Sequence, residues 1–207
     1  MVIAIDGPAG AGKSTVARTV AERLGFTFLD TGAMYRAVAL AAAEQGEDPV
    51  AVAEAVSLDV GDRVLLDGRD VTDAIRTPEV SAAASRVAAD PGVRAALVRK
   101  QQEIMREGDW VAEGRDIALV VAPGAEVKVF LTAAPEERAR RRAEQRGQDP
   151  EQVLKEQHER DQRDASGARS VLEPAPDAVP VDTTGLSLRE VVDQIETLAV
   201  EARELAG

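Results

Sequence analysis

The sequence predicts a three-layer α/β fold in which helices cover a parallel sheet. Val2 to Ile5 is a continuous apolar run, typical of a strand that is buried on both faces. Directly after it, apolar residues recur at helical spacing between residues 13 and 24. Further strand-like and helix-like segments then alternate along the chain, which is the order that a parallel sheet requires.

The later elements of the predicted core continue this alternation. A second strand is expected at 26–29, followed by a helix from Thr31 to Gln45 that ends at Gly46. Short apolar runs predict further core strands at 110–112, 127–131 and 178–181.

Capping signals mark the starts of three further helices. Thr77-Pro78 and Asp90-Pro91 each place a capping residue before a proline, so two helices are expected within 77–107. Ser187 with Glu190 forms a capping box that opens a C-terminal helix. In the segment 64–71 an Asp-Gly pair separates two short apolar runs, which predicts a hairpin and hence a small subdomain inserted in the core.

Composition excludes several classes of function. The net charge of −12 argues against a nucleic-acid polymer as partner, because such binding depends on basic residues that neutralise phosphates. With no cysteine and a single histidine, the chain lacks disulfides, thiol chemistry and a multi-histidine metal site, so any metal must be bound by oxygen. No apolar run suits a membrane span, and Asp6 interrupts the N-terminal run before a signal peptide could form, so we expect a cytoplasmic protein.

The basic residues are mostly arginine, 21 of the 25. Because the planar guanidinium grips phosphate with two hydrogen bonds, local arginine clusters in an acidic protein suggest a small phosphorylated ligand. Codon bias in an arginine-rich genome explains the composition equally well.

A phosphate-binding motif lies between the first predicted strand and helix. The segment Gly7-Pro8-Ala9-Gly10-Ala11-Gly12-Lys13-Ser14 satisfies G-x-x-x-x-G-K-[ST] in the structural context that this motif needs. Its backbone N–H groups would hold phosphate oxygens, Lys13 would reach the β- and γ-phosphates, and Ser14 would ligate Mg²⁺. We therefore predict that residues Gly7 to Thr15 bind ATP.

Two polar clusters follow predicted strands and suggest where an acceptor binds. Thr31, Tyr35 and Arg36 come after the second strand. Taken alone, a solvated Arg36 and a packed Tyr35 would be the more ordinary interpretations, and the three gain weight only together. Glu113-Gly114-Arg115-Asp116 follows the strand expected at 110–112. Open α/β sheets bind their ligands at the carboxyl ends of strands, which makes both clusters candidate sites.

Together these motifs resemble bacterial cytidylate kinases over nearly the whole chain. The resemblance rests on the phosphate loop and on four further segments in the same order and at compatible spacing: Asp30 to Arg36, Ile75-Arg76-Thr77 with Ser85 and Arg94, Gly114-Arg115-Asp116, and Glu159-Arg160-Asp161 with Asp164. It implies a single nucleoside monophosphate kinase domain with a phosphate-loop core, a CMP-binding insert and a mobile lid. We place the core at about 1–45, 77–135 and 175–207, the insert at about 46–76 and the lid at about 136–170.

The resemblance also implies roles for single residues. Thr31, Tyr35, Arg36 and Arg115 would surround the CMP phosphate and sugar, and Ser85, Arg94 and Asp116 would read the cytosine. This set suits cytosine, which presents an amine donor beside two acceptors. In the lid, Arg142 and Arg160 would stabilise the transferring phosphoryl group together with Lys13 and Arg115, while Arg160 and Asp164 would also contact CMP.

The chain departs from the family pattern at two places. Ala118-Leu119 replaces Gly-Thr after Ile117, and Gly167 occupies the position of a lid arginine that Arg169 could replace. The other four arginines of the 138–146 helix are expected mostly on a solvated face, and His158 is expected to be exposed.

The sequence leaves some alternatives open. Another small-acceptor kinase, acting on UMP, AMP or shikimate, would have a similar loop and lid, whereas a GTPase would need a guanine motif that the chain lacks. The preference between CMP and dCMP is open as well. We expect a monomer, and the absence of both asparagine and cysteine predicts high thermal stability.

Overall fold

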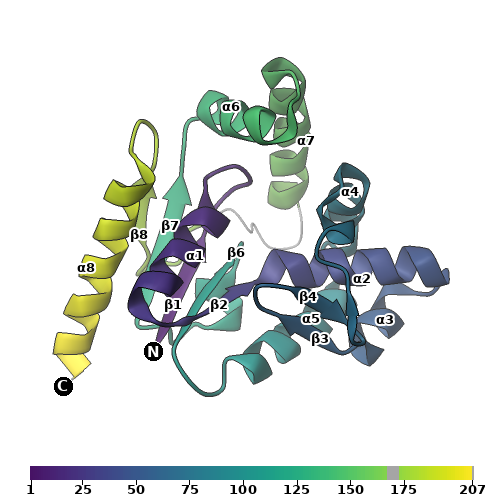
Figure 1. Ribbon diagram of the computed structural model, residues 1–207, viewed down its shortest axis with the longest axis horizontal. Coiled ribbons are helices and arrows are strands. Elements are labelled where there is room, and N and C mark those ends of the chain that lie inside the picture. Colours follow the sequence, from purple (N-terminus) through teal and green to yellow (C-terminus); the bar gives the residue numbers. More distant parts are fainter. Residues whose placement is uncertain (167–172, 207) are drawn as a thin grey trace. The chain divides into compact units, whose positions relative to one another are not determined.

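The computed structural model describes residues 1–166 and 173–206, except for the side chains of residues 146, 160, 163–166 and 206. The chain forms two compact units, and Figure 1 labels their elements. The first unit comprises Met1–Phe28 and Gly108–Gly207, and the second comprises Leu29–Glu107.

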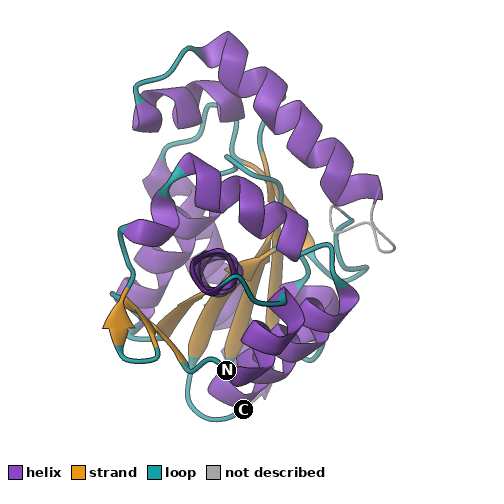
Figure 2. Ribbon diagram, turned by 90° about the vertical axis from the view of Figure 1, so that its right-hand side faces the viewer, coloured by secondary structure: helices purple, strands orange, loops and turns teal. Residues whose placement is uncertain are grey.

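A parallel sheet is the centre of the fold, as the sequence predicts. Its strand order is β2-β6-β1-β7-β8, and Figure 2 draws it in orange among the purple helices. Ile3 of β1 pairs with Val111 of β6 on one side and with Val127 of β7 on the other. The strands are β1 (Val2–Asp6), β2 (Thr27–Asp30, which passes from the first unit into the second), β6 (Trp110–Gly114), β7 (Val127–Thr132) and β8 (Val179–Asp182).

Helices α1 (Lys13–Leu24) and α8 (Leu188–Ala206) pack on each other, and they also contact strands of this sheet. Their apolar faces share one buried cluster with the strands, which includes Val16, Val20 and Ile195. The predicted capping box opens α8: the Glu190 carboxylate accepts from the Ser187 backbone N–H at 2.8 Å, and the Glu190 N–H donates to the Ser187 hydroxyl at 3.3 Å. Val16, in the first turn of α1, belongs to this cluster, so the start of the helix beside the phosphate loop is packed against the core.

Two helices follow β7 in the first unit, α6 (Pro135–Arg146) and α7 (Pro150–Ser166). They pack against each other around a small apolar cluster of Ala139, Ala143 and Val153. Apart from Pro135, both helices lie within the residues that were expected to form the lid, about 136–170.

The second unit is mostly helical. Its helix α2 begins at Thr31 and ends at Gln45, where Gly46 takes a left-handed conformation with φ 68°, as the sequence predicts. The predicted caps Thr77 and Asp90 accept hydrogen bonds from the first turns of the next two long helices. The helices of this unit are α2 (Thr31–Gln45), α3 (Pro49–Ala55), the 3₁₀ turn η1 (Ala74–Arg76), α4 (Pro78–Val87) and α5 (Pro91–Ile104).

A small antiparallel sheet of β3 (Leu58–Val60), β4 (Val64–Leu66) and β5 (Arg69–Asp70) completes this unit. Asp67 and Gly68 turn the chain between β4 and β5 with φ values of 50° and 80°, which confirms the predicted hairpin. Neither β3 nor α3 was expected from the sequence. Both are very short, so their hydrophobic periodicity carries little signal.

No helix in the described part of the chain is long and apolar enough to cross a membrane.

Candidate active site

The phosphate loop joins β1 to α1 and has a backbone that requires glycine. Gly7 has φ 146°, and a Cβ atom there would lie 2.0 Å from the carbonyl oxygen of Leu131 on β7. Gly12 has φ 88° and caps α1. The loop therefore passes close to its neighbouring strand and presents its N–H groups at the start of a helix, the arrangement that binds anions.

Two side chains at the start of α1 have partners in or beside the loop. The ammonium of Lys13 donates to the carbonyl oxygen of Pro8 at 3.0 Å. The hydroxyl of Ser14 donates to the carboxylate of Glu113, which is buried at the carboxyl end of β6. In the sequence Glu113 belongs to a charged cluster, but no pattern there assigns it a role. Its place at the end of a core strand is the signal that would have singled it out.

Asp6 connects the loop to the segment that follows β6. Its carboxylate accepts hydrogen bonds of 2.8 Å from the backbone N–H groups of both Ile117 and Ala118. Burial raises the pKa of Asp6 to about 6, an effect that the two backbone N–H groups and Lys13 oppose and the nearby Asp116 carboxylate reinforces.

The segment Ile117–Val121 forms a single π-helical turn, which the sequence analysis did not predict. It contains the Ala118-Leu119 departure from the family pattern, and Ala118 supplies a backbone N–H rather than a side chain to the contact with Asp6. Just before this turn, Asp116 is buried, and the guanidinium of Arg115 donates to the carbonyl oxygen of Gly7 at 3.2 Å. Arg115 therefore contacts the phosphate loop, and Asp116 lies close enough to Asp6 to affect the pKa of its carboxyl group.

In the second unit, Asp30 organises the start of α2. One carboxylate oxygen accepts from the Ala33 N–H at 2.9 Å, and the other forms a 2.8 Å ion pair with Arg36. Thr31 is buried at the first position of the helix, and Tyr35 is half-buried. Arg36 is therefore fixed by a carboxylate rather than free in solvent, which the sequence did not reveal.

Three buried polar atoms in this unit have no hydrogen-bond partner among the described residues. They are Nε of Arg36, the hydroxyl oxygen of Ser85 on α4 and the side-chain amide nitrogen of Gln101 on α5. Buried polar groups are normally paired, so atoms of this kind mark places where a ligand or water completes the structure. Arg94 lies on α5 and is half-buried.

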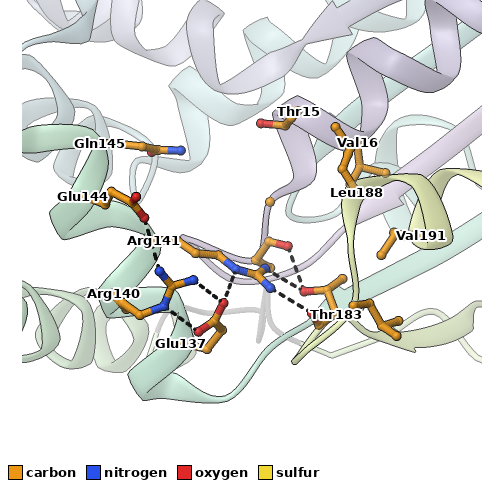
Figure 3. A pocket seen from close by; sticks show the side chains of 13 residues that line it. Thr15, Val16, Glu137, Arg140, Arg141, Glu144, Gln145, Thr183, Leu188 and Val191 are labelled. Carbon is orange, nitrogen blue, oxygen red and sulfur yellow. Dashed lines mark hydrogen bonds and ion pairs between the residues drawn. The ribbon is translucent and has the colours of Figure 1, made fainter.

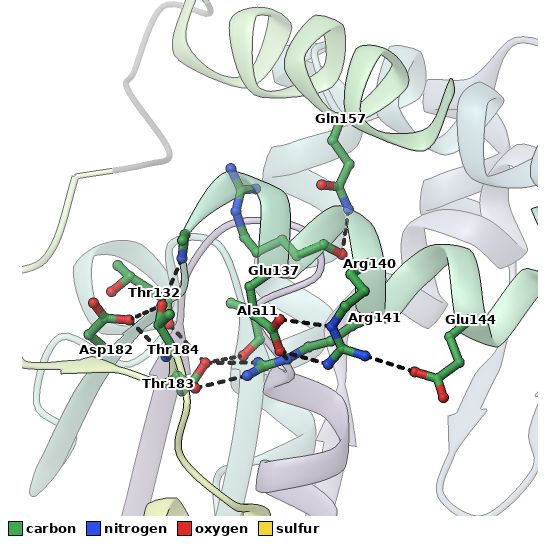
Figure 4. A network of polar contacts seen from close by, with 12 residues as sticks. Ala11, Thr132, Glu137, Arg140, Arg141, Glu144, Gln157, Asp182, Thr183 and Thr184 are labelled. Atoms are coloured by element: carbon green, nitrogen blue, oxygen red, sulfur yellow. Dashed lines mark hydrogen bonds and ion pairs between the residues drawn. The ribbon is translucent and has the colours of Figure 1, made fainter. Parts of the chain in front are cut away.

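On α6, the arginines predicted to share a solvated face have different environments. Arg140 and Arg141 both hydrogen-bond to Glu137 and lower the pKa of its carboxyl group to about 2. Arg141 also donates to the hydroxyl and carbonyl oxygens of Thr183, at 2.9 and 2.8 Å (Figure 4). Arg142 is half-buried and Arg138 is buried, so Arg138 departs from the solvated face that was expected for most of these arginines.

A cavity of about 390 Å³ opens beside the phosphate loop within the first unit. Figure 3 shows the polar side chains of α6 on one side, and Thr15 and Val16 of α1 with Leu188 and Val191 of α8 on the other. The remaining lining residues include Ala11, Gly12, Thr183 and Leu186. A space of this size, with apolar walls and a few fixed polar groups, suits a small organic ligand.

A protein-family model described as cytidylate kinase matches residues 3–201. The chain belongs to the cytidylate kinase family. The cytidylate kinase of Solibacter usitatus is 51% identical to this chain, and the match covers 94% of this chain and 90% of the relative. The cytidylate kinase of Carboxydothermus hydrogenoformans is 48% identical, and the match covers 94% of this chain and 95% of the relative. A solved gluconokinase from Sinorhizobium meliloti shares the fold with a TM-score of 0.54 at 21% identity, covering 99% of this chain and 95% of that one.

Membership of the cytidylate kinase family confirms the resemblance and disfavours the alternative acceptors. Not every expected site residue of a cytidylate kinase can be placed. Arg160 and Asp164 lie in α7, but their side chains are outside the described residues, as are Gly167 and Arg169 entirely. His158 is exposed, as expected, and its ring lies 2.9 Å from the amide of Gln162.

Proposed function

As a member of the cytidylate kinase family, the protein transfers a phosphoryl group from ATP to CMP, and we propose how its residues divide this task. The backbone N–H groups of Gly7 to Thr15 hold the ATP phosphates, and Lys13 neutralises the oxygens that gain charge during transfer. The glycine-dependent loop at the start of α1 is the observation that supports this assignment most directly. No general base is required, because the acceptor is itself a phosphate.

The base of ATP would occupy the cavity beside the loop. Leu186, Leu188 and Val191 give the cavity an apolar wall, and the planar guanidinium of Arg141 gives it a stacking surface. The two hydrogen bonds from Arg141 to Thr183 fix that guanidinium before any ligand arrives. A flat aromatic base next to the phosphate site matches both features.

Mg²⁺ would bind at Ser14, with Glu113 beside it. The hydroxyl and carboxylate oxygens are the hard donors that Mg²⁺ prefers. No cluster of three or more acidic, histidine or cysteine side chains among the described residues could hold a metal by itself. That suits Mg²⁺, which usually keeps several waters and takes its other ligands from substrate phosphates. When bound, the ion supplies positive charge at the transferring phosphates.

Glu113→Gln tests this assignment of the metal site. The amide can still accept from Ser14 but has lost its negative charge, so the Mg²⁺ concentration needed for half-maximal rate should rise at least about fivefold, roughly 1 kcal/mol. An unchanged Mg²⁺ dependence would remove Glu113 from the site.

For CMP, we propose the residue roles that the resemblance implies. Thr31, Tyr35, Arg36 and Arg115 would contact the phosphate and sugar of the acceptor. Asp116 and the hydroxyl of Ser85 would meet the cytosine amine and Arg94 its acceptors, a pattern that uracil and adenine do not match. The unpartnered atoms of Ser85 and Arg36 support this proposal, because CMP would supply their missing partners.

The lid would contribute Arg142, Arg160 and Asp164. Arginines that approach on closure stabilise charge on the transferring phosphoryl group, an effect worth about 10³ to 10⁵ in rate in related chemistry. Asp164 would accept a hydrogen bond from a sugar hydroxyl.

A coupled assay of ATP with CMP, dCMP, UMP and AMP tests the acceptor assignment. We expect far higher kcat/KM for CMP and dCMP than for the other two. Equal turnover of AMP would refute the cytosine site.

The protein would act as a cytoplasmic monomer without a nucleic-acid polymer as partner. The net charge of −12 supports the last point. Light scattering after size-exclusion chromatography would contradict the monomer if it gave a mass well above 21.9 kDa.

A further inference from the structure

Arg138 differs from Arg140, Arg141 and Arg142 on the same helix in being buried. Only 9% of its side chain is exposed, whereas the side chain of Arg140, two positions later, is 58% exposed. A buried guanidinium stays charged and loses its hydration, so it needs close partners.

The partners of Arg138 come from two other segments of the first unit. One terminal nitrogen donates to the carbonyl oxygen of Ala9, in the phosphate loop, at 3.0 Å. The other forms a 2.8 Å ion pair with Asp161 on α7. The carbonyl oxygen of Arg138 accepts from the amide of Gln157, also on α7, at 3.2 Å, and Figure 4 shows this amide reaching toward α6. One residue thus joins the loop, α6 and α7.

The loop and this cluster are in tight contact. A Cβ atom on Gly10 would lie 2.8 Å from the Gln157 amide nitrogen and 3.0 Å from the Arg138 carbonyl oxygen. The position of α7 and the conformation of the loop at Gly10 therefore depend on each other.

The contact with Ala9 fixes the direction of a loop N–H group. In a trans peptide the C=O of one residue and the N–H of the next point in opposite directions. Because the Ala9 carbonyl points at Arg138, the N–H of Gly10 points away from it. If the peptide between Ala9 and Gly10 rotated, the N–H of Gly10 would turn toward Arg138. The carbonyl oxygen of Ala9 would then face any anion bound in the loop.

The cluster is poorly optimised for stability alone. Nε of Arg138, one carboxylate oxygen of Asp161 and the amide oxygen of Gln157 have no hydrogen-bond partner among the described residues. Buried ion pairs with unsatisfied atoms contribute little to stability relative to apolar packing. A role in arranging the site explains such a cluster better than a role in stability.

We propose that Arg138 is a positioning residue for phosphoryl transfer, which ties the orientation of the phosphate loop to the placement of α7 through Asp161. Asp161 follows Arg160 directly, and Asp164 lies one turn further along the same side of α7. The ion pair would therefore place both of these substrate-contacting candidates when the loop is correctly formed. This inference rests on the proposed binding of ATP phosphates by the loop.

A double-mutant cycle with Arg138→Met and Asp161→Asn tests the proposal. At saturating ATP and CMP, Arg138→Met should lower kcat at least about tenfold, or roughly 1.4 kcal/mol, and Asp161→Asn at least threefold. The kcat of the double variant should lie within about twofold of that of Arg138→Met, because both changes break the same ion pair between Arg138 and Asp161. Rates are measured at a temperature where circular dichroism shows every variant to be folded.

Arg23 and Asp193 provide a matched control. They form an ion pair of 2.7 Å between α1 and α8. The hydrogen bonds of the Arg23 side chain go to Asp193 and Glu196 on α8, away from the phosphate loop. Arg23→Met, Asp193→Asn and their double variant should keep kcat within twofold of the parent, whatever their effect on Tm.

A purely structural role would give a different pattern. If Arg138→Met lowers Tm but leaves kcat within threefold of the parent, or if the two changes multiply, the proposal is wrong. Should Arg138→Met fail to fold, Arg138→Lys takes its place in the cycle with Asp161→Asn. A single ammonium cannot contact both the Ala9 carbonyl and Asp161 as the guanidinium does. A kcat of Arg138→Lys within threefold of the parent would again show that the proposal is wrong.

Calorimetry with a non-hydrolysable ATP analogue separates this proposal from the assignment of the acceptor. Arg138→Met should weaken binding at least about fivefold even if CMP proves not to be the acceptor. Unchanged analogue affinity together with unchanged kcat would overturn the role of Arg138, whereas a parent enzyme that ignores CMP would overturn only the acceptor.

Discussion

Asp6 accepts a 2.8 Å hydrogen bond from the backbone N–H of Ile117, a residue 111 positions further along the chain. This contact joins the end of β1 to the turn that follows Arg115 and Asp116. Because Asp6 directly precedes the phosphate loop, it is placed to influence both the segment proposed to bind ATP and the segment proposed to bind the acceptor.

The raised pKa of Asp6 predicts a pH-dependent contribution to stability. Burial raises it from 3.8 to about 6 in the folded chain. The folded state then binds more protons than the unfolded state, so the contribution is fully present below about pH 4 and is lost as pH rises through about 6. The difference corresponds to roughly 3 kcal/mol.

Urea unfolding of the parent and of Asp6→Asn between pH 4 and 7 checks this expectation. Other carboxyl groups titrate in both proteins, so the difference between the two curves isolates Asp6. The parent should lose stability relative to Asp6→Asn as the pH rises, and parallel curves would contradict the assignment.

Lys13→Ala should abolish most turnover while the fold is preserved. Its ammonium lies along the loop, against the Pro8 carbonyl, and would move to the transferring phosphates. Loss of such a preorganised charge costs about 10² to 10³ in kcat. Lys155→Ala, an exposed change on α7, serves as the control in the same coupled assay. Normal activity of Lys13→Ala would refute the assignment of the loop.

Gly10→Ala should impair catalysis beyond its effect on the backbone. A left-handed residue other than glycine costs about 1–2 kcal/mol, and here the added methyl also meets the Gln157 amide and Arg138. Gly25→Ala is the control, because Gly25 has a similar φ of 68° but no atom lies within 4 Å of a Cβ added there. We expect both variants to lose stability but only Gly10→Ala to lose at least about tenfold in kcat. Equal kcat values for the two variants would show that the loop tolerates the contact.

Ser85→Ala should weaken CMP binding without destabilising the protein. Its buried hydroxyl oxygen has no hydrogen-bond partner among the described residues, so removing it costs the unliganded chain little. If CMP supplies the partner, KM for CMP should rise about tenfold, with KM for ATP and Tm nearly unchanged. Ser57→Ala, at an exposed position of the same unit, is the control. A fall in Tm with unchanged KM would assign Ser85 to packing instead.

Most of the secondary structure and the phosphate loop could be predicted from the sequence because their signals are local. Gly46 ends α2 in a left-handed conformation, Asp90 caps α5, and Asp67-Gly68 turns the hairpin, each by conformational preferences of the residues themselves. The strand predicted at 26–29 was found at Thr27–Asp30, a shift of one residue at each end. Such shifts are expected, because strand ends depend on pairing with a neighbour.

Tertiary structure alone decided which polar residues meet. Ser14 and Glu113 are 99 positions apart, and Arg138 and Ala9 are 129 apart, so no local pattern links them. In the sequence Arg138 is one of several similar arginines on a polar helix. Its burial follows from the face of α6 that packs against α7 and the loop, and that face is set by contacts between segments distant in sequence. The sequence therefore determined the chemistry available to this protein, and the packing of its helices determined which of those groups lie at the phosphate loop.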